Sequence, residues 1–381
     1  MRRRRRSWIR IAGTLSALAG LVASGAGCGV VPPISFGATG AATPGGSVAR
    51  RAGVSGGSTI LWESDADQAR ELDAIAATGA KWFELDVDWN HIQYEGPGAW
   101  HWNAATDRLV TAARARGLTL IGMLAYSPPW ARGADCPPGS LHCLPANPAD
   151  FARFARAAVQ RYGANGSNPA RRGAIEHWVV WNEPNHRPFA QPKPNLDRYT
   201  AVLEAAYPAI KAADPSATVV TGATSPAGDA PDGTDIAPVT WLRGLYARGA
   251  RGSFDAVGHH PYSFPTNPLE AHSWNAFTQT QDLYAVMVAN GDGAKKIWGT
   301  EAGAPTGAAA NAVTETQQAQ WVRDYFVGWN TTFRPFTGPL IWFQARDSGS
   351  APAIWDENLG LLRRDWSAKP AYAALTDVMR S

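Results

Sequence analysis

Apolar, strand-like runs alternate along this chain with stretches in which apolar residues recur at helical spacing. Residues 195–215 are typical of the helical stretches, because their apolar positions fall three or four residues apart and Pro215 follows their end. The strand-like runs are short and rich in β-branched and aromatic residues. We expect strands at residues 59–63, 81–89, 118–126, 175–183, 218–223, 254–262, 296–303 and 339–347.

A helical stretch follows each expected strand, the last at residues 369–380, and such alternation predicts parallel strand–helix units. Eight units in about 320 residues fit the α/β class and a single closed (β/α)8 TIM barrel over residues 58–381, since such barrels usually take about 250 residues plus loop insertions. An open doubly wound sheet is the main alternative. It would carry a glycine-rich phosphate turn after the first strand, where residues 59–68 read TILWESDADQ.

The N-terminal residues do not fit this pattern. Residues 1–27 have a basic head and then an apolar run with small residues near its end, which is typical of an export signal. The motif RRSWIR resembles a twin-arginine signal, although Trp8 stands where such signals usually carry Phe, so the Sec route stays open. Residues 28–57 are rich in Gly, Ala and Pro and predict a flexible tether, so folded structure is expected from Ser58. The expected location is extracellular or attached to the cell envelope.

The chain has three cysteines. Cys28 follows a small-residue stretch that resembles a lipoprotein cleavage box, with Gly25 in place of the usual Leu; lipid anchoring to the membrane through Cys28 and ordinary signal cleavage nearby are both open. Cys136 and Cys143 predict a disulfide, because an exported protein meets an oxidising compartment and a metal site would need two further ligands nearby. The sequence has no cluster of metal ligands, so we expect neither a metal nor another cofactor.

The basic head also fits a second interpretation, a patch for nucleic acid. Residues 1–27 contain six of the 35 basic residues and none of the 32 acidic ones, which leaves 29 basic residues once this segment is removed. The resulting net charge of about −3 gives no electrostatic footprint for a polyanion. Nucleic acid is therefore not an expected partner.

Side chains suited to sugar binding gather where the expected strands end, which is where barrel enzymes place their chemistry. Carboxylates can act on a glycosidic oxygen and an anomeric carbon, amides and imidazoles on hydroxyls, and flat rings on the apolar faces of pyranoses. The expected partner is a carbohydrate, either a polysaccharide or an oligosaccharide. The candidates are Asp86, Asp88, Trp89, Tyr126, Trp130, Asn182, Glu183, His259, His260, Tyr262, Glu301 and Trp342.

Glu183 and Glu301 stand out, because each ends an otherwise apolar run and Glu is costly to bury without a partner. They close the fourth and seventh expected strands, which lie across the mouth of a barrel from one another. Their carboxyl groups could therefore lie about 5 Å apart, the separation used in a retaining double displacement. Two carboxylates that close cannot both ionise freely, so one of the two pKa values should rise.

Four motifs at strand ends carry a resemblance to a known family: WNEPN at 181–185, HHPY at 259–262, IWGTEAG at 297–303 and LIWF at 340–343. Together they resemble clan A glycoside hydrolases, most closely family 39, which contains β-xylosidase-like enzymes and endoglycosidases that trim exopolysaccharide. The resemblance extends over nearly all of residues 58–381. It implies the barrel fold and the hydrolysis of glycosides.

The resemblance also implies roles for individual residues. Glu183 would be the acid/base and Glu301 the nucleophile. Asn182 would hold the 2-hydroxyl of the bound sugar, while His260 and Tyr262 would orient and hydrogen-bond the nucleophile. Because neighbours on a strand point to opposite faces, one of the two histidines in HHPY is expected to be a packing residue.

Tryptophans are the expected platforms for sugar rings. Trp342 would form the floor beneath the sugar. A place in the barrel core is the alternative, because 17 tryptophans are too many for all of them to serve as platforms. Trp89, Trp130, Trp274 and Trp355 are weaker platform candidates.

The second expected strand departs from the family pattern. Relatives often carry a basic residue there, whereas this chain has Glu84, Asp86 and Asp88 at period two. These acids could pair with Arg346 or another basic residue across the barrel, raise the pKa of neighbouring carboxylates, form a polar layer inside the barrel, or line a sugar subsite. The sequence leaves these alternatives open.

The function expected from these features is that of a retaining glycoside hydrolase that cleaves β-glycosidic bonds by double displacement. A non-catalytic carbohydrate-binding barrel of the cell envelope is the alternative, and a structural envelope protein is a third. A binding module has no need of a close carboxylate pair whose repulsion costs energy, so the pair favours the enzyme. The sugar, its linkage and endo or exo cleavage stay open, because the loops after the strands set them.

Overall fold

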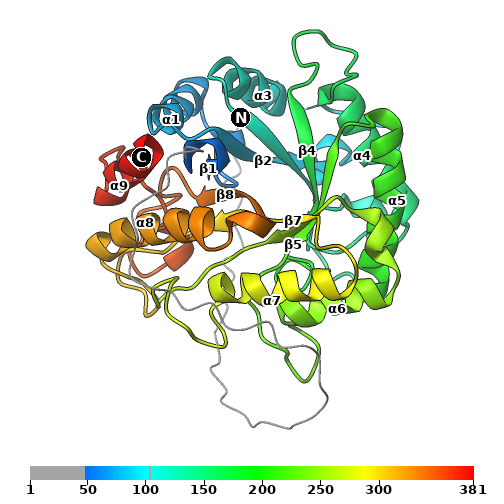
Figure 1. Ribbon diagram of the computed structural model, residues 1–381. Coiled ribbons are helices and arrows are strands. Elements are labelled where there is room, and N and C mark those ends of the chain that lie inside the picture. Colours follow the sequence, from blue (N-terminus) through cyan, green and yellow to red (C-terminus); the bar gives the residue numbers. More distant parts are fainter. Residues whose placement is uncertain (1–47, 103) are drawn as a thin grey trace, which may run out of the picture. The chain divides into compact units, whose positions relative to one another are not determined.

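The chain folds into a closed barrel of parallel strands. The computed structural model describes residues 48–102 and 104–381. Within them, eight strands pair in chain order and β8 returns to pair with β1 (Figure 1). The strands are β1 (Ala52–Ser55), β2 (Trp82–Asp88), β3 (Thr119–Ala125), β4 (Ile175–Asn182), β5 (Thr218–Ala223), β6 (Ala256–His259), β7 (Lys296–Ala302) and β8 (Thr337–Phe343).

A helix follows each strand, and the helices surround the barrel (Figure 1). One further helix, α2, is a single turn directly after β2, so α3 completes the second strand–helix unit. This arrangement confirms the predicted single (β/α)8 barrel. The helices are α1 (Asp65–Ala77), α2 (Trp89–Ile92), α3 (Ala104–Ala115), α4 (Pro148–Tyr162), α5 (Leu196–Ala213), α6 (Pro238–Ala247), α7 (Ala276–Ala289), α8 (Glu315–Thr331) and α9 (Pro370–Arg380).

Side-chain caps fix where several of these helices begin. The Ser64 hydroxyl accepts a hydrogen bond from the Asp67 backbone N–H at 3.1 Å ahead of α1. At the start of α8, Thr314 and Gln317 each accept a hydrogen bond from the other's backbone N–H. Such caps satisfy N–H groups that a helix leaves without an internal partner. Polar residues just before an apolar repeat therefore decide where the helix starts.

Alternation along the strands builds two apolar layers. Outward-pointing residues on β2, such as Leu85 and Val87, pack in the large core beneath the helices. Glu84, Asp86 and Asp88 alternate with them along β2, so these acids face the barrel interior. The apolar residues that fill the interior are Ile121, Met123, Val179, Val220, Ala256, Trp298 and Ile341.

The first strand lies earlier in the chain than predicted. Residues 59–63 do not form a strand, because Ile60–Trp62 is a 3-10 turn and β1 is the run Ala52–Ser55. Small residues are needed in β1, which lies between β8 and β2: a Cβ at Gly53 would come within 2.6 Å of the Trp82 carbonyl oxygen. A run of small residues has the composition of a linker, which explains why composition predicts a tether there.

The predicted tether, residues 28–57, therefore ends too late. Residues 48–55 belong to the barrel, since Val48–Arg51 forms a 3-10 turn directly ahead of β1. Residues 1–47, with the expected export signal and Cys28, lie outside the described residues. No helix in the described part of the chain is long and apolar enough to cross a bilayer.

Cys136 and Cys143 form the predicted disulfide, which closes a loop between β3 and α4. Cys143 is buried and makes a backbone bridge to Gln191 in the segment that follows β4. The disulfide loop is thereby attached to the segment that leads away from Glu183.

Candidate active site

The predicted catalytic residues Glu183 and Glu301 lie at the same end of the barrel. Glu183 directly follows β4, and Glu301 is the second-last residue of β7. Because all the strands are parallel, their carboxyl ends meet at one mouth. Glu183 is buried and Glu301 is half-buried.

The backbone turns sharply as β4 ends. Trp181 and Glu183 have φ values of 76° and 43°, in the left-handed region that residues other than glycine rarely adopt. Two hydrogen bonds hold this turn: the Glu183 N–H donates to the Ala223 carbonyl at 3.0 Å, and the Trp181 indole N–H donates to the Phe189 carbonyl at 2.8 Å. Such conformations cost about 1–3 kcal/mol each and collect at functional sites. The strain is therefore placed at the residue that delivers the carboxylate.

One histidine nitrogen joins the two carboxylates. His260 Nδ1 lies 3.0 Å from Glu183 Oε1 and 3.6 Å from Glu301 Oε2. The Tyr262 hydroxyl donates to the same Glu301 oxygen at 2.8 Å. The segment just after β6 thus brings both of its predicted site residues to the carboxylates.

His259 is the packing residue of the histidine pair. Its Nδ1 lies 2.9 Å from the Thr224 hydroxyl, and its Nε2 donates to the Ala276 carbonyl at 2.9 Å. Burial lowers the pKa of His259 to about 4, so the ring is neutral at ordinary pH. The expectation that one of the two histidines packs in the core is confirmed.

Burial and the position of His260 set the electrostatics of the pair. Burial raises the pKa of Glu301 and the charge of Glu183 adds to this, against the lowering effects of His260 and Tyr262. Burial also acts to raise the pKa of Glu183, but the hydrogen bond and charge of His260, together with smaller effects of His186 and Ser225, outweigh it, so the pKa of Glu183 is lowered. As expected, one pKa of the pair rises. It is that of Glu301, whereas the resemblance gives the acid role to Glu183.

His260 completes this arrangement as a cation. Burial acts to lower the pKa of His260, but the charges of Glu301 and Glu183 outweigh burial and raise it. In the free site Glu183 therefore ionises more readily than Glu301, and the charges of the two carboxylates favour the cationic form of His260.

An acidic row on β2 lies beside Glu301. Burial raises the pKa of Asp86 to about 7, with further contributions from the charges of Asp88 and Glu301. Burial raises the pKa of Asp88 to about 6, against the hydrogen bonds that its carboxylate accepts from backbone N–H groups. Burial also raises the pKa of Glu84, to which the charges of Glu301 and Asp86 add. The row therefore disfavours additional negative charge at Glu301.

Arg346 does not neutralise this row. Its guanidinium forms ion pairs with Glu63 and, at 3.1 Å, with Glu71, and it lies over the Trp366 ring at 3.9 Å from the ring centroid. Within the described residues Glu84, Asp86 and Asp88 form no ion pair with Arg346 or with another basic residue, so the pairing alternative is wrong there. The raised pKa values of these inward-facing carboxyl groups fit the alternative in which the acids of β2 raise the pKa of neighbouring carboxylates.

Asn182 lies beside an aromatic wall. Its side-chain amide donates to the Tyr126 hydroxyl at 3.2 Å. The Tyr126 ring lies 4.5 Å from the His142 ring and 6.4 Å from the Phe189 ring. His142 and Phe189 are not among the predicted site residues, because both come from loops and only the fold brings them to Asn182.

Two of the predicted sugar platforms are wrong. Trp342 has no exposed surface and packs edge-on against Tyr325 of α8 at 6.1 Å, in the layer between barrel and helices. Trp89 is also fully buried, and it stacks on Phe154 of α4 at 5.4 Å. Both side chains point away from the barrel interior, toward the helices, so neither can touch a sugar in the mouth. Trp130 is half-buried and meets Trp89 edge-on at 5.7 Å.

A row of three rings leads from Glu301 toward solvent. Tyr262 packs edge-on against Phe264 at 5.5 Å, and Phe264 lies 5.4 Å from Trp355. Trp355, a weaker platform candidate in the sequence, is 37% exposed. Phe264 was not predicted, because no local pattern distinguishes it from a core aromatic residue.

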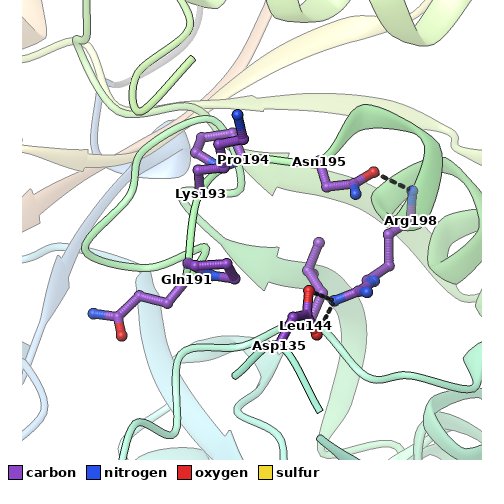
Figure 2. A pocket seen from close by; sticks show the side chains of 8 residues that line it. Asp135, Leu144, Gln191, Lys193, Pro194, Asn195 and Arg198 are labelled. Carbon is purple, nitrogen blue, oxygen red and sulfur yellow. Dashed lines mark hydrogen bonds and ion pairs between the residues drawn. The ribbon is translucent and has the colours of Figure 1, made fainter. Parts of the chain in front are cut away.

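A small cavity of about 120 Å³ lies between the disulfide loop and the segment after β4 (Figure 2). One wall is fixed by the ion pair of Arg198 with Asp135 at 3.1 Å. The lining includes neither Glu183 nor Glu301, so the cavity is separate from the carboxylate pair. It is lined by Asp135, Leu144, Gln191, Pro192, Lys193, Pro194, Asn195 and Arg198.

Several solved structures share the fold of this barrel. No protein-family model and no curated protein matches the chain. A family 39 glycoside hydrolase from the gut symbiont Bacteroides cellulosilyticus WH2 matches with a TM-score of 0.68 at 21% identity, over 86% of this chain and 63% of that chain. The chain thus spans less than two thirds of the length of that protein. The chain has the barrel fold of family 39 glycoside hydrolases.

Two further solved structures share the fold. A monomeric β-xylosidase from Caulobacter crescentus CB15 matches with a TM-score of 0.63 at 17% identity, over 87% of this chain and 68% of that chain. A glucosidase from Croceicoccus marinus matches with a TM-score of 0.62 at 14% identity, over 81% of this chain and 63% of that chain. The resemblance to family 39 that the motifs carry is thereby confirmed for the fold.

Proposed function

We propose that this protein is a retaining glycoside hydrolase that cleaves β-glycosidic bonds of a polysaccharide or oligosaccharide, with Glu183 as acid/base and Glu301 as nucleophile. The observation that carries the proposal is the contact of both carboxylates with one atom, His260 Nδ1, at 3.0 and 3.6 Å. The glycoside hydrolases that share the fold support the same reaction class.

The shared histidine also limits the distance between the carboxylates. The two contacting oxygens lie 3.0 and 3.6 Å from His260 Nδ1. Their separation cannot exceed the sum of these two distances, and it reaches that sum only if the three atoms are collinear. Retaining enzymes hold their carboxyl groups about 5–5.5 Å apart, whereas inverting enzymes need about 6.5–9.5 Å to admit a water. The geometry therefore favours double displacement.

In the first step, a Glu301 carboxylate oxygen attacks the anomeric carbon as the glycosidic C–O bond breaks, and Glu183 gives its proton to the leaving oxygen. In the second step, water attacks the anomeric carbon of the glycosyl ester, the bond to Glu301 breaks, and Glu183 takes the proton of the water. Esterification removes the charge of Glu301. The pKa of Glu183 then falls further, which suits its second role as a base.

The free site and the reactive site differ in which carboxyl group holds a proton more readily. In the free site Glu301 has the raised pKa, while the reaction needs the proton on Glu183. His260 can move a proton between the two carboxyl groups, because its Nδ1 contacts both. It gives its proton to Glu183 and takes one from Glu301. A bound glycoside favours this exchange, since its glycosidic oxygen accepts a hydrogen bond only from a protonated Glu183.

The proposal extends to export and envelope location. The disulfide between Cys136 and Cys143 supports it, because such bonds persist in oxidising compartments. Anchoring through Cys28 remains a proposal about a residue outside the described range, and mass spectrometry of the mature N-terminus tests it by showing either a lipid or a free terminus.

Two glutamine variants test the reaction. We expect Glu183→Gln and Glu301→Gln each to lower turnover of a polymeric substrate by about a thousandfold, since each removes one partner of a two-residue mechanism. Glu204→Gln, on the exposed surface of α5, is the matched control. The first product seen by ¹H NMR should keep the β configuration. An α product, or a glutamine variant with normal turnover, contradicts the proposal.

A further inference from the structure

A second cavity, of about 270 Å³, lies outside the carboxylate site. Two of its residues, Trp100 and Trp102, come from the segment between α2 and α3, and the others come from the C-terminal half of α4 and the chain just after it. None of them belongs to the group around His260. The lining residues are Trp100, Trp102, Ala157, Gln160, Arg161 and Ser167.

The two tryptophan rings form a stacked pair. Their centroids are 5.7 Å apart with an interplanar angle of 11°. Trp102 is held in place by Tyr162, which meets it edge-on at 5.9 Å, and by the Arg161 guanidinium at 4.9 Å from its ring centroid. Trp102 is therefore a fixed support, half-buried against the core, on which the Trp100 ring rests.

Trp100 presents an open surface on this support. It is 37% exposed, although burying a tryptophan is strongly favourable. Gln160 and Ser167 are exposed at the same cavity and add an amide and a hydroxyl. A flat aromatic ring beside a few polar groups suits a pyranose, whose apolar face stacks on the ring while its hydroxyls form hydrogen bonds.

Other ligand classes fit this cavity less well. A stable protein partner would need about 800 Å² of surface from this side, but Trp100 is the one large apolar side chain among the six lining residues that is exposed. A nucleic acid would need cations for its phosphates, but the lining Arg161 already forms an ion pair with Asp107. A sugar ring without phosphate is the ligand that this lining matches.

We propose that the Trp100 cavity is a second carbohydrate-binding site, which holds a pyranose unit of a polysaccharide chain. The choice of ligand rests on the proposed glycosidase function. Binding at two sites of one chain raises the effective concentration of the polymer at the barrel mouth without any new contact there. The cavity therefore favours long substrates over short ones.

Affinity gel electrophoresis tests this site. The catalytically disabled Glu301→Gln protein is run through native gels that contain xylan, mixed-linkage β-glucan or galactan, with and without the additional change Trp100→Ala. We expect at least one polysaccharide to retard the parent, and Trp100→Ala to weaken that binding by about tenfold. Trp100→Phe should restore most of it, because a ring remains. Trp62→Ala removes another exposed tryptophan and should bind like the parent.

A hydrolysis assay separates this proposal from the proposed function. With Glu301 intact, Trp100→Ala should cleave a small aryl β-glycoside at the parental rate but lose activity on the retarding polysaccharide. Retardation that Trp100→Ala leaves unchanged, or no retardation by any of the polysaccharides, overturns the second site even if aryl glycosides are cleaved. Retardation that depends on Trp100, in a protein that cleaves no glycoside, upholds the site and overturns the proposed function.

Discussion

At the residue scale, the chemistry depends on one nitrogen between two carboxylates. His260 Nδ1 lies closer to Glu183 than to Glu301, at 3.0 against 3.6 Å. The shorter contact gives Glu183 a hydrogen bond from His260, whereas Glu301 receives only the charge of His260, which does not outweigh burial and the charge of Glu183. The Tyr262 hydroxyl acts in the same direction as the charge of His260, because its hydrogen bond favours the ionised form of Glu301.

Tyr262→Phe tests this part of the account. Loss of a hydrogen bond to a charged group should lower kcat/KM by about ten- to a hundredfold. The pKa of Glu301 should rise further, so the acidic limb of the pH–rate profile should move to higher pH. The profile is the decisive measurement, because a purely structural defect would lower the rate without moving the limb.

Tyr246→Phe is the control for this change. Tyr246 lies on α6, where its hydroxyl donates to Asp292 at 2.9 Å, so its loss removes a tyrosine–carboxylate hydrogen bond outside the site. A Tyr262→Phe enzyme with an unshifted acidic limb contradicts the proposed role of the hydroxyl.

The sequence predicts part of this site for physical reasons. Glu183 and Glu301 each end an apolar run, a position where burying a carboxylate is costly unless it has a partner. Trp342 shows the limit, because a shift of one position along a strand moves a side chain from the mouth to the outer core. The distribution of protons cannot be predicted from sequence, since it depends on sub-ångström differences in the distances to His260 Nδ1.

At the element scale, strand identity depends on neighbours as much as on composition. The strands β2 to β8 could be predicted, because each lies in a run that carries large apolar, β-branched or aromatic residues, even β6 with its four residues. β1 could not, because its small residues are selected by contact with β2 and β8 and not by strand propensity. The place of Phe264 could not be predicted either, since its partner Trp355 comes from another strand–helix unit.

The segments after β6 and β8 together build the row Tyr262, Phe264 and Trp355. We expect Trp355→Ala to raise KM for an oligosaccharide of several sugars by about tenfold, because an exposed ring at the end of the row can stack on a distant sugar. KM for an aryl monoglycoside, measured in the same assay, should stay unchanged. Trp62→Ala, at another exposed tryptophan, should alter neither constant. Equal effects of Trp355→Ala on the two substrates contradict a role in binding distant sugars.

At the scale of the whole molecule, the closed barrel encloses carboxylates that a more open fold would leave in water. Asp86 illustrates the consequence: burial raises its pKa from 3.8 to about 7, so the folded state holds a proton that the unfolded state releases. The cost of the buried charge is absent below pH 3.8, grows as the pH rises, and is complete above about pH 7.

Asp86→Asn should therefore stabilise the protein selectively at high pH. We expect the free energy of unfolding to rise by at least about 1 kcal/mol at pH 8 and to change little at pH 3, because the Asp86 carboxyl group of the parent is mostly protonated in both states there. Urea unfolding at pH 3, 6 and 8 measures this, with Glu204→Gln on the exposed surface as control. A gain that is the same at all three pH values contradicts the raised pKa.

The central claim is that Glu301 forms a covalent bond to the sugar, and mechanism-based labelling tests it most directly. The protein is incubated with 2-deoxy-2-fluoro-β-glycosides of xylose, glucose and galactose that carry a dinitrophenolate leaving group, and its peptic peptides are analysed by mass spectrometry. We predict time-dependent inactivation and a fluoroglycosyl group on Glu301. A label on Glu183 or Asp86, or turnover of the parent glycosides by a protein that is never labelled, would contradict the account.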